Sequence, residues 1–289
     1  MEFEPLTPQF GALVQAKAAT DIMSLNREEV VATYRSAGAI LFRGFKVSEE
    51  QFGTFADQFT TELRVNGMRS RESVSSDGKT QTVNLGNNVI PFHSEMGYSP
   101  FRPSLLWFHC VVPPSWKGET TIVDGVALWS ALPEDVREQF TTRKVLYSFT
   151  NVGAEFDFFG HPGPPTKEEI DSLETRGNVK VTTKADGGID VEHTVHAAKR
   201  PRHIDQYAFC NSVIIRPGGG GSTTFEGGDP ISDDLRLKLF ETASSLALLH
   251  KWRAGDILML DNLRVMHGRQ AFKAGDPRRI LVRMGEERF

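Results

Sequence analysis

The chain has 289 residues, of which 39% are hydrophobic and 24% charged, and its formal net charge is −4. This balance is typical of a globular protein with a sizeable core, and the lack of a basic excess argues against a nucleic-acid partner. No signal peptide and no apolar run long enough to cross a bilayer is recognisable. The two cysteines, Cys110 and Cys210, lie far apart, so we expect a cytoplasmic protein without a disulfide framework or a cysteine zinc site.

The first sixty residues predict a mixed α/β segment. Asn26 can cap a helix over Arg27–Ser36 that Gly38 ends, and a short buried strand follows at Ala39–Phe42. The run Ser48-Glu49-Glu50-Gln51 has the spacing of a capping box, which predicts a second helix with core-facing phenylalanines.

The middle of the chain predicts short strands. Residues 62–90 are polar, with a possible strand at Thr80–Leu85. Clearer strands are expected at Ser104–Val112 and Glu119–Val123, because both are rich in β-branched or aromatic residues and the first is closed by two prolines. A helical pattern then runs over Ala127–Phe140.

The pattern fades between residues 150 and 200, which predicts a lid or flexible insert within a single domain. A helix is expected at Ser232–Leu248, followed by short strands at Gly255–Leu260, Val265–His267 and Ile280–Val282. Many short strands with helices mainly to one side predict a mainly β fold with flanking helices and a jelly-roll core. The first and last strands can lie side by side in such a double sheet.

The stretch Pro91–Met96 carries the first residues that indicate chemistry. In an extended segment His93 and Glu95 leave the same face, because Cβ direction alternates with a period of two. An imidazole and a carboxylate that converge in this way can share a divalent metal, and His267 is the candidate third ligand. The three would form the two-histidine, one-carboxylate facial triad of non-haem Fe(II) oxygenases. A His-x-Glu tripeptide alone is weak evidence, so the context matters.

Several further stretches, spread over nearly the whole chain, agree with this interpretation. In chain order the stretches are Phe10–Ala12, Gly38–Gly44, Phe92–Met96, Gly118–Thr120, Asp261–Asn262, His267 and Arg278–Arg283. The combination resembles the taurine dioxygenase and clavaminate synthase-like superfamily of Fe(II)- and 2-oxoglutarate-dependent oxygenases. The resemblance implies a double-stranded β-helix core and one oxygenase domain over residues 1–289.

The resemblance implies that His93, Glu95 and His267 bind the iron. Many members of the family carry Asp where this chain has Glu95, and clavaminate synthase-like members carry Glu. The carboxylate argues against the halogenase branch, in which Gly or Ala stands at that position. Three ligands on one octahedral face leave three positions, which 2-oxoglutarate and O₂ would occupy.

The resemblance also implies residues that bind 2-oxoglutarate. Thr120 falls on the threonine that hydrogen-bonds the co-substrate. Arg279 falls on the arginine that grips its distal carboxylate, for which a planar guanidinium is suited. Arg283 is similar to an arginine that faces either the co-substrate or an anionic substrate. Positions 279 and 283 share a face of a strand, so we expect both arginines to look inward.

The implied reaction oxidises an unactivated C–H bond of a small polar metabolite, in specialised or amino-acid-derived metabolism. Hydroxylation is the default outcome, and desaturation or cyclisation would use the same site. The oligomeric state is not indicated. Candidate substrate contacts lie on both sides of the triad, at Asn84, Asn87, Tyr98, Arg102 and Arg264.

Two other functions use the same features. A metal-dependent hydrolase or lyase could use the triad without 2-oxoglutarate, but would not need Arg279. A metal-free binding module on a jelly-roll scaffold would need neither the triad nor Arg279. A second metal pair at His193 and His196 has no strong third ligand nearby, so we interpret these residues as solvated loop histidines.

Overall fold

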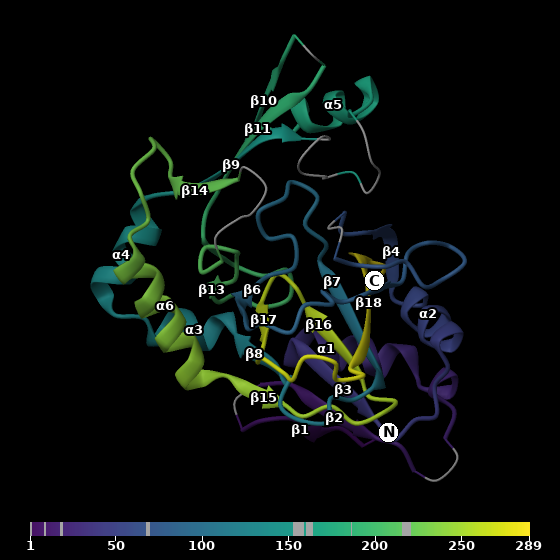
Figure 1. Ribbon diagram of the computed structural model, residues 1–289. Coiled ribbons are helices and arrows are strands. Elements are labelled where there is room, and N and C mark those ends of the chain that lie inside the picture. Colours follow the sequence, from purple (N-terminus) through teal and green to yellow (C-terminus); the bar gives the residue numbers. More distant parts are fainter. Residues whose placement is uncertain are drawn as a thin grey trace.

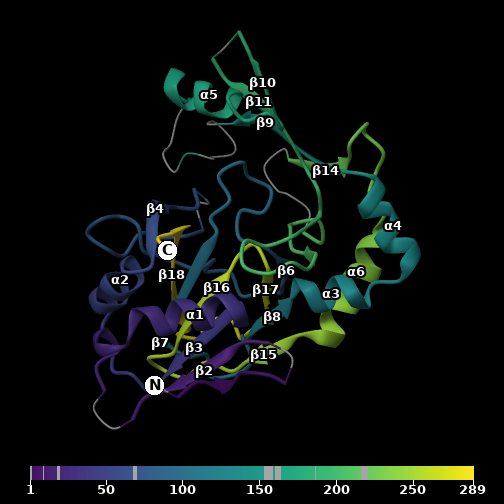
Figure 2. The same cartoon turned by 180° about the vertical axis from the view of Figure 1, so that it is seen from behind.

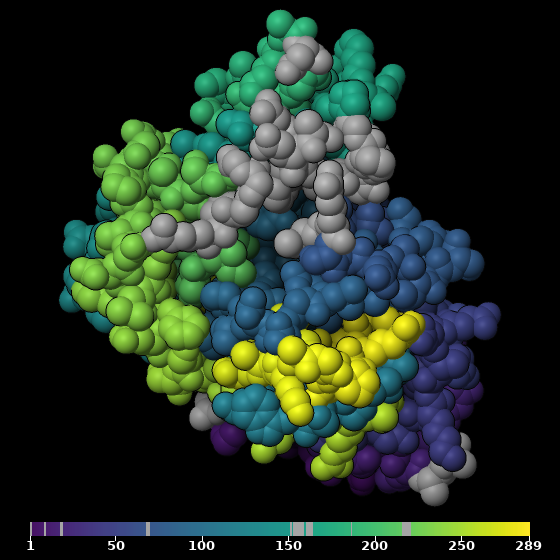
Figure 3. Space-filling model, in the orientation of Figure 1, coloured from purple at the N-terminus to yellow at the C-terminus, as the bar shows by residue number. Residues whose placement is uncertain are grey.

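The computed structural model describes residues 2–8, 10–17, 20–67, 70–152, 159, 164–185, 187–215 and 221–289. In this part of the chain two β-sheets lie at the centre and a smaller sheet projects from one end (Figure 1). The carboxyl-terminal strand lies beside the segment around residues 60–100, although the two are far apart in sequence (Figure 3). Within the described ranges, each helix is too short or too polar to serve as a transmembrane span.

The larger central sheet, called the major sheet, has strand β7 near its middle. β7 pairs antiparallel with β16 on one side and with β18 on the other. The sheet continues from β16 through β3 and β2 to β1, and β18 also pairs with β4 and β5. Its strands are β1 (Glu4–Pro5), β2 (Ala12–Gln15), β3 (Ala39–Arg43), β4 (Thr60–Arg64), β5 (Gln81–Thr82), β7 (Leu105–Val112), β16 (Ile257–Asp261) and β18 (Arg279–Glu287).

The second central sheet, called the minor sheet, has the strand order β15-β8-β17-β6. An apolar layer joins it to the major sheet and contains Phe108, Ile122 and Leu258. Two facing sheets around one apolar layer form the predicted jelly-roll core, so the mainly β fold with flanking helices is confirmed. The strands of the minor sheet are β6 (Ile90–His93), β8 (Thr120–Asp124), β15 (Leu248–His250) and β17 (Val265–Arg269).

The first two helices begin where the sequence predicts. The Asn26 side chain accepts hydrogen bonds from two backbone amides of α1 (Arg27–Ala37), and Gly38 ends this helix with a φ of 72°. Ser48 forms the predicted capping box at the start of α2 (Glu49–Asp57). Both helices pack against the major sheet on the face that points away from the minor sheet (Figure 2).

Strand β18 is therefore covered on both faces. Ile280 and Val282 point into the layer between the two sheets, whereas Leu281 points to the helix side, where it joins a cluster with Trp107 of β7. Successive side chains of a strand leave opposite faces. The odd-numbered residues of β18 therefore face α1 and α2, and the even-numbered residues face the minor sheet.

Of the remaining helices, two contact the minor sheet and one belongs to the projection. The helical pattern predicted over residues 127–140 is present as two helices, because Pro133 divides it. Proline has no amide hydrogen, and it disfavours helical geometry in the residue before it. The remaining helices are the 3₁₀ helix η1 (Ile22–Ser24), α3 (Gly125–Ala131), α4 (Glu134–Thr142), α5 (Lys167–Glu174) and α6 (Asp233–Leu246).

The projecting sheet and α5 form a region that we call the arm (Figure 1). Although the sequence pattern fades over residues 150–200, Lys167–Glu174 form α5, and Val179–Thr183 and Ile189–Val195 pair as a hairpin. Thr166 opens α5 with a capping box, and the hairpin buries Ile189 and Val191. The strands are β9 (Val145–Val152), β10 (Val179–Thr183), β11 (Ile189–Val195) and β14 (Ser222–Phe225), and a ribbon of β12 (Ala198–Lys199) and β13 (Ala208–Phe209) follows β11.

Residues 153–158 and 160–163, in the predicted insert, lie outside the described part of the chain. The movement of a lid around residues 150–200, and a single domain over the whole chain, stay predictions.

Candidate metal centre

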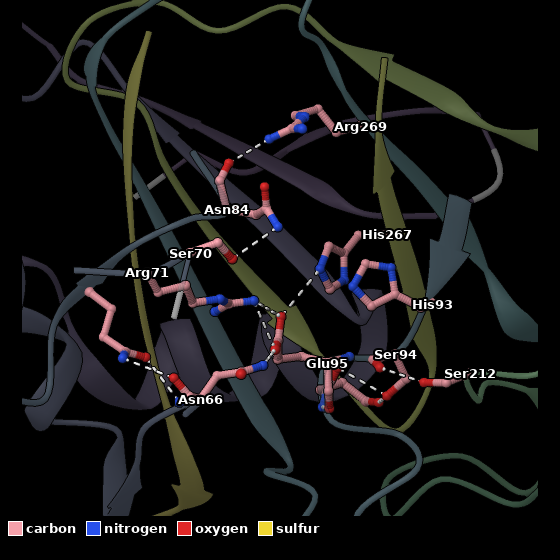
Figure 4. A network of polar contacts seen from close by, with 12 residues as sticks. Asn66, Ser70, Arg71, Asn84, His93, Ser94, Glu95, Ser212, His267 and Arg269 are labelled. Atoms are coloured by element: carbon pink, nitrogen blue, oxygen red, sulfur yellow. Dashed lines mark hydrogen bonds and ion pairs between the residues drawn. The ribbon is translucent and has the colours of Figure 1, made fainter. Parts of the chain in front are cut away.

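Three potential metal ligands meet where β6 pairs with β17. His93 lies opposite His267 in this antiparallel pair, and the centroids of the two rings are 4.4 Å apart. Oε2 of Glu95 lies 3.8 Å from Nε2 of His267. Donor atoms of the three residues all lie within 4.8 Å of one another. The structure therefore brings the predicted triad together (Figure 4).

Both imidazoles are suited to bind a metal as neutral ligands. Burial lowers the pKa of His93, and burial together with the charge of His93 lowers the pKa of His267 well below its usual range. Nδ1 of His93 donates a hydrogen bond to the carbonyl oxygen of Pro91 at 2.9 Å. This bond leaves the lone pair on Nε2, and a metal-binding histidine is commonly oriented in this way.

The Glu95 carboxylate is buried and is held by two side chains from the polar stretch before it. Nδ2 of Asn66 donates to Oε1 at 2.8 Å, and Nη2 of Arg71 lies 2.9 Å from both carboxylate oxygens (Figure 4). Burial alone would raise the pKa of Glu95, but the charges of Arg71 and the two histidines outweigh it and lower the pKa to about 2. The carboxylate is therefore ionised at neutral pH, as a metal ligand must be.

This donor set fits Fe(II), because two imidazoles and one carboxylate form the facial triad of non-haem iron oxygenases. The cavity at the triad, called the metal pocket, has a volume of about 40 Å³. A water needs about 10–15 Å³, so the pocket has room for an ion and one or two waters but not for a metabolite. A larger co-substrate would require long side chains in the wall to move, and Arg278, whose guanidinium makes one described hydrogen bond, is one of them.

A glycine allows the two histidine strands to lie close together. A Cβ atom on Gly268 would lie 2.6 Å from the carbonyl oxygen of Ile90 in β6 and 2.7 Å from Oγ1 of Thr121 in β8. Contacts this short would force the strands apart. Gly268 therefore permits the pairing that sets the separation of His93 and His267.

The wall of the metal pocket also contains Thr120 and two arginines. The hydroxyl of Thr120 accepts a hydrogen bond from Nε1 of Trp252 at 3.0 Å. Arg278 donates to the carbonyl oxygen of Gly118, and Arg269 donates to two backbone carbonyls. Burial lowers the pKa of each arginine to about 10, and neither forms an ion pair within the described residues. Buried guanidinium groups without a carboxylate partner suit a site that receives an anion.

The prediction that Arg279 and Arg283 look into the site is wrong. Both are odd-numbered residues of β18 and lie on its helix-covered face. Arg279 is half-exposed and pairs with Glu49 of α2 at 2.8 Å, and Arg283 is buried and pairs with two aspartates. Arg278, the other member of the arginine pair, lines the metal pocket instead.

Of the candidate substrate contacts before the triad, only Asn84 lines the metal pocket among the described residues. Its backbone carbonyl accepts a hydrogen bond from Arg269, and its amide nitrogen donates to Oγ of Ser70. Asn87 lies outside that lining, and its amide nitrogen is 3.4 Å from the carbonyl oxygen of Phe272.

The candidates after the triad lie away from the metal pocket. Tyr98 packs its ring against Phe149 of β9, with 5.5 Å between the ring centroids. Arg264 is buried in a two-bond ion pair with Asp124, which assigns it a structural part. Arg102 lines a different cavity.

Asn66, Arg71 and Arg278 are the site residues that the sequence did not single out. The first two lie in a polar stretch without periodicity, so no signal distinguishes them from solvated neighbours. For Arg278 no pattern was usable either, because Ile280, Leu281 and Val282 are all apolar and do not alternate with polar residues.

Comparison with known proteins agrees with this geometry. The family model described as "Taurine catabolism dioxygenase TauD, TfdA family" matches residues 2–284. A clavaminate synthase-like protein of Arabidopsis thaliana is 26% identical over 290 residues, which cover 91% of this chain and 86% of that protein. The 3-((Z)-2-isocyanoethenyl)-1H-indole synthase of Fischerella ambigua is 24% identical, with coverage of 95% of this chain and 92% of that protein.

Solved structures of other proteins share this fold. A taurine dioxygenase from Burkholderia xenovorans superposes with a TM-score of 0.65 at 16% identity, over 98% of this chain and 88% of that one. The family match covers nearly the whole chain, and the triad and the double sheet are both present. The chain belongs to the TauD/TfdA family and is a non-haem Fe(II)- and 2-oxoglutarate-dependent oxygenase with a small-molecule substrate.

Proposed function

We propose that this enzyme oxidises an unactivated C–H bond of a small polar metabolite, with His93, Glu95 and His267 as the iron ligands. The observation that carries the proposal is the triad, in which Glu95 and His267 are buried, beside a cationic wall. When bound with 2-oxoglutarate and O₂, Fe(II) supplies the oxidising power that no side chain has. Hydroxylation is the default outcome. The ethenyl group in the name of the Fischerella relative makes desaturation the second outcome to test.

We propose that Arg278 receives the distal carboxylate of 2-oxoglutarate and that Thr120 hydrogen-bonds the same co-substrate. Three arginines line the metal pocket, and Glu95 is the only acidic residue among its described lining. A dianionic co-substrate would offset this excess of buried positive charge. The guanidinium of Arg278 keeps its terminal nitrogens available, because its only hydrogen bond among those described uses Nε.

Asn66 and Arg71 are the proposed positioning residues for the carboxylate ligand. Asn66 occupies Oε1 of Glu95, so Oε2, which is the oxygen nearer to His267, is the one that faces the metal. Arg71 keeps the carboxylate ionised and fixed before the metal arrives. Both arguments concern the orientation of a ligand, not direct contact with a substrate.

The predicted location and pathway have weaker support. Cys110 and Cys210 are both free and buried, which is compatible with a reducing cytoplasm. A place in specialised or amino-acid-derived metabolism is supported only by the kind of product named for the Fischerella relative.

A matched pair of variants tests the co-substrate site. Under argon, titration with Fe(II) and 2-oxoglutarate should give the weak visible charge-transfer band of the chelate. Arg278→Gln should raise the 2-oxoglutarate concentration needed for half saturation by about tenfold or more, because a charge-assisted bidentate pair is lost. Arg279→Gln removes the same charge one residue away and should leave the titration unchanged. The reverse result would return the assignment to Arg279.

The substrate itself requires a screen. Succinate release above the uncoupled background, measured across candidate polar metabolites, would identify a substrate, because co-product formation rises when oxidation is coupled. A hydrolase or lyase on the same triad would turn over a substrate without consuming 2-oxoglutarate. A product with no matching succinate would therefore contradict the proposed reaction.

A further inference from the structure

A second cavity, called the basic pocket, lies between the arm and the segment that follows Glu95. Its volume is about 240 Å³. Most of its wall comes from the segment 97–102, the turn between α5 and β10, strand β11, the end of β12 and the two residues after β13. None of its described lining residues lines the metal pocket, so the two cavities are distinct.

The wall of the basic pocket is cationic. It contains Arg102, Arg176, Lys199 and Arg200, and no aspartate or glutamate is among the described residues that line it. Arg200 forms an exposed ion pair with Asp205 outside the pocket. The other three cations form no ion pair within the described ranges.

Arg102 is held rigidly by groups that carry no charge. Nη1 donates to the carbonyl oxygen of Cys210 at 3.0 Å, and Nη2 donates to the carbonyl oxygen of Asn262. Nε is buried and has no partner among the described residues. Carbonyl oxygens orient the guanidinium but leave its charge uncompensated, and this is costly away from water.

Arg176 and Lys199 approach the same space from the arm and from the ribbon. Nη1 of Arg176 donates to the carbonyl oxygen of Pro100 at 3.0 Å, and its guanidinium lies 4.8 Å from the centre of the Phe101 ring. The ammonium group of Lys199 makes no hydrogen bond within the described part of the chain, although its backbone pairs with Ala208. Burial and, next, the charge of Arg102 lower the pKa of Lys199, which indicates that two like charges lie near each other.

His193 adds a neutral group to the same wall. It is only 6% exposed, contrary to the expected solvated loop histidine. Its Nδ1 lies 3.0 Å from the carbonyl oxygen of Tyr98, so the ring is fixed. Burial lowers its pKa to about 4, and the charges of Lys199, Arg176 and Arg102 act in the same direction. The fixed ring is thus surrounded by cations and has no acid beside it.

We propose that the basic pocket binds a small oxyanion ligand, a metabolite with carboxylate or phosphate groups, through Arg102, Arg176 and Lys199. Guanidinium and ammonium groups are the usual partners of both oxyanions. A cavity of about 240 Å³ suits a small molecule rather than a polymer. The overall charge of −4 also disfavours a nucleic-acid ligand. This site goes beyond the proposed oxygenase function and does not depend on it.

Calorimetric titration of the full-length chain tests the proposal. The probes are sulfate, as a tetrahedral oxyanion, and tricarballylate, as a polycarboxylate. Saturating Fe(II) and 2-oxoglutarate, under argon, occupy the metal pocket. We expect one site for at least one probe, and the better probe identifies the class of anion. Lys199→Gln and Arg176→Gln should each weaken binding by about tenfold or more.

Three controls make the result decisive. Lys238→Gln removes an exposed cation on α6, outside the basic pocket, and should leave binding unchanged. Arg278→Gln should also leave it unchanged, because Arg278 belongs to the metal pocket. Thermal melts of each variant check that the fold persists. The proposal is overturned if neither probe binds, if Lys238→Gln weakens binding equally, or if binding is lost in Arg278→Gln and kept in Lys199→Gln.

Discussion

The metal pocket and the basic pocket are both lined by arginines, but their charges are balanced differently. In the metal pocket Arg71 lies against the buried carboxylate of Glu95, and the triad can add a metal ion. In the basic pocket Arg102 is held by two carbonyl oxygens and the Cys210 sulfur, none of them a carboxylate, and Lys199 lies near it. Guanidinium groups alone therefore do not identify a site. The acid beside them determines whether a cavity holds a metal with an anion or an anion only.

The largest expected effect is the loss of iron binding in His267→Ala, compared with a histidine variant of the basic pocket. His267→Ala removes one of three metal ligands, so the chelate band should disappear and succinate release should fall by a factor of about a thousand or more. His196→Ala, in the wall of the basic pocket, should change neither. The measurements are the anaerobic titration and the coupled assay. A chelate band that persists in His267→Ala would contradict the triad.

The next largest effect concerns protein stability and the buried ion pair of Arg71 and Glu95. Arg71→Met leaves the carboxylate of Glu95 buried without its cation, which should lower the free energy of unfolding of the metal-free protein by about 3 kcal/mol. Fe(II) should restore part of this loss, because the metal replaces the missing charge. Urea denaturation with and without metal measures both.

The exposed pair of Lys180 and Glu192 in the arm provides the control for Arg71→Met. Lys180→Met should cost about 1 kcal/mol or less, with or without metal. If Arg71→Met lowered the free energy of unfolding equally with and without Fe(II), Arg71 would stabilise the protein by packing and not by balancing the charge of Glu95.

The third effect is a pH dependence from the basic pocket. The pKa of His193 is about 4 in the folded protein and 6.5 when unperturbed. Between these values the unfolded chain binds more protons, so this histidine makes stability fall as pH falls from 6.5 to 4, by up to about 1.4 kcal/mol per pH unit. His193→Asn should remove this contribution, as seen in urea denaturation across that range. Parallel curves for the two proteins would contradict the folded pKa.

The smallest effect is expected for an arginine that belongs to neither pocket. Arg279 is 41% exposed and pairs with a similarly exposed Glu49. Arg279→Gln should change the free energy of unfolding by about 1 kcal/mol or less. A loss comparable to that of Arg71→Met, measured by the same urea denaturation, would indicate that the outer face of β18 carries more than a surface pair.

Local signals in the sequence predicted the helices and the triad well. The caps at Asn26 and Ser48 depend on neighbouring residues alone, so they can be read from a single chain. The period of two predicted that His93 and Glu95 converge, and they do, although β6 ends at His93 and Glu95 lies in the turn that follows. The family pattern then supplied His267, which no local rule connects to the other two.

The wrong predictions concern residues whose positions depend on tertiary packing. Leu281 and Ile280 are both buried, so hydrophobicity could not show which face of β18 looks inward, and Arg279 was chosen in place of Arg278. The partners of Glu95 come from a stretch whose place depends on pairing with β18 far along the chain. The charge of the basic pocket likewise results from residues brought together by tertiary folding.

Gly268 has a consequence that reaches beyond local packing. It contributes no donor atom, yet any side chain there would press on Ile90 and Thr121 and widen the gap that the ion must bridge. We therefore expect iron affinity to depend on a residue that has no coordination chemistry. Gly268→Ala should produce a folded protein in which all three ligands are present but the ion binds more weakly.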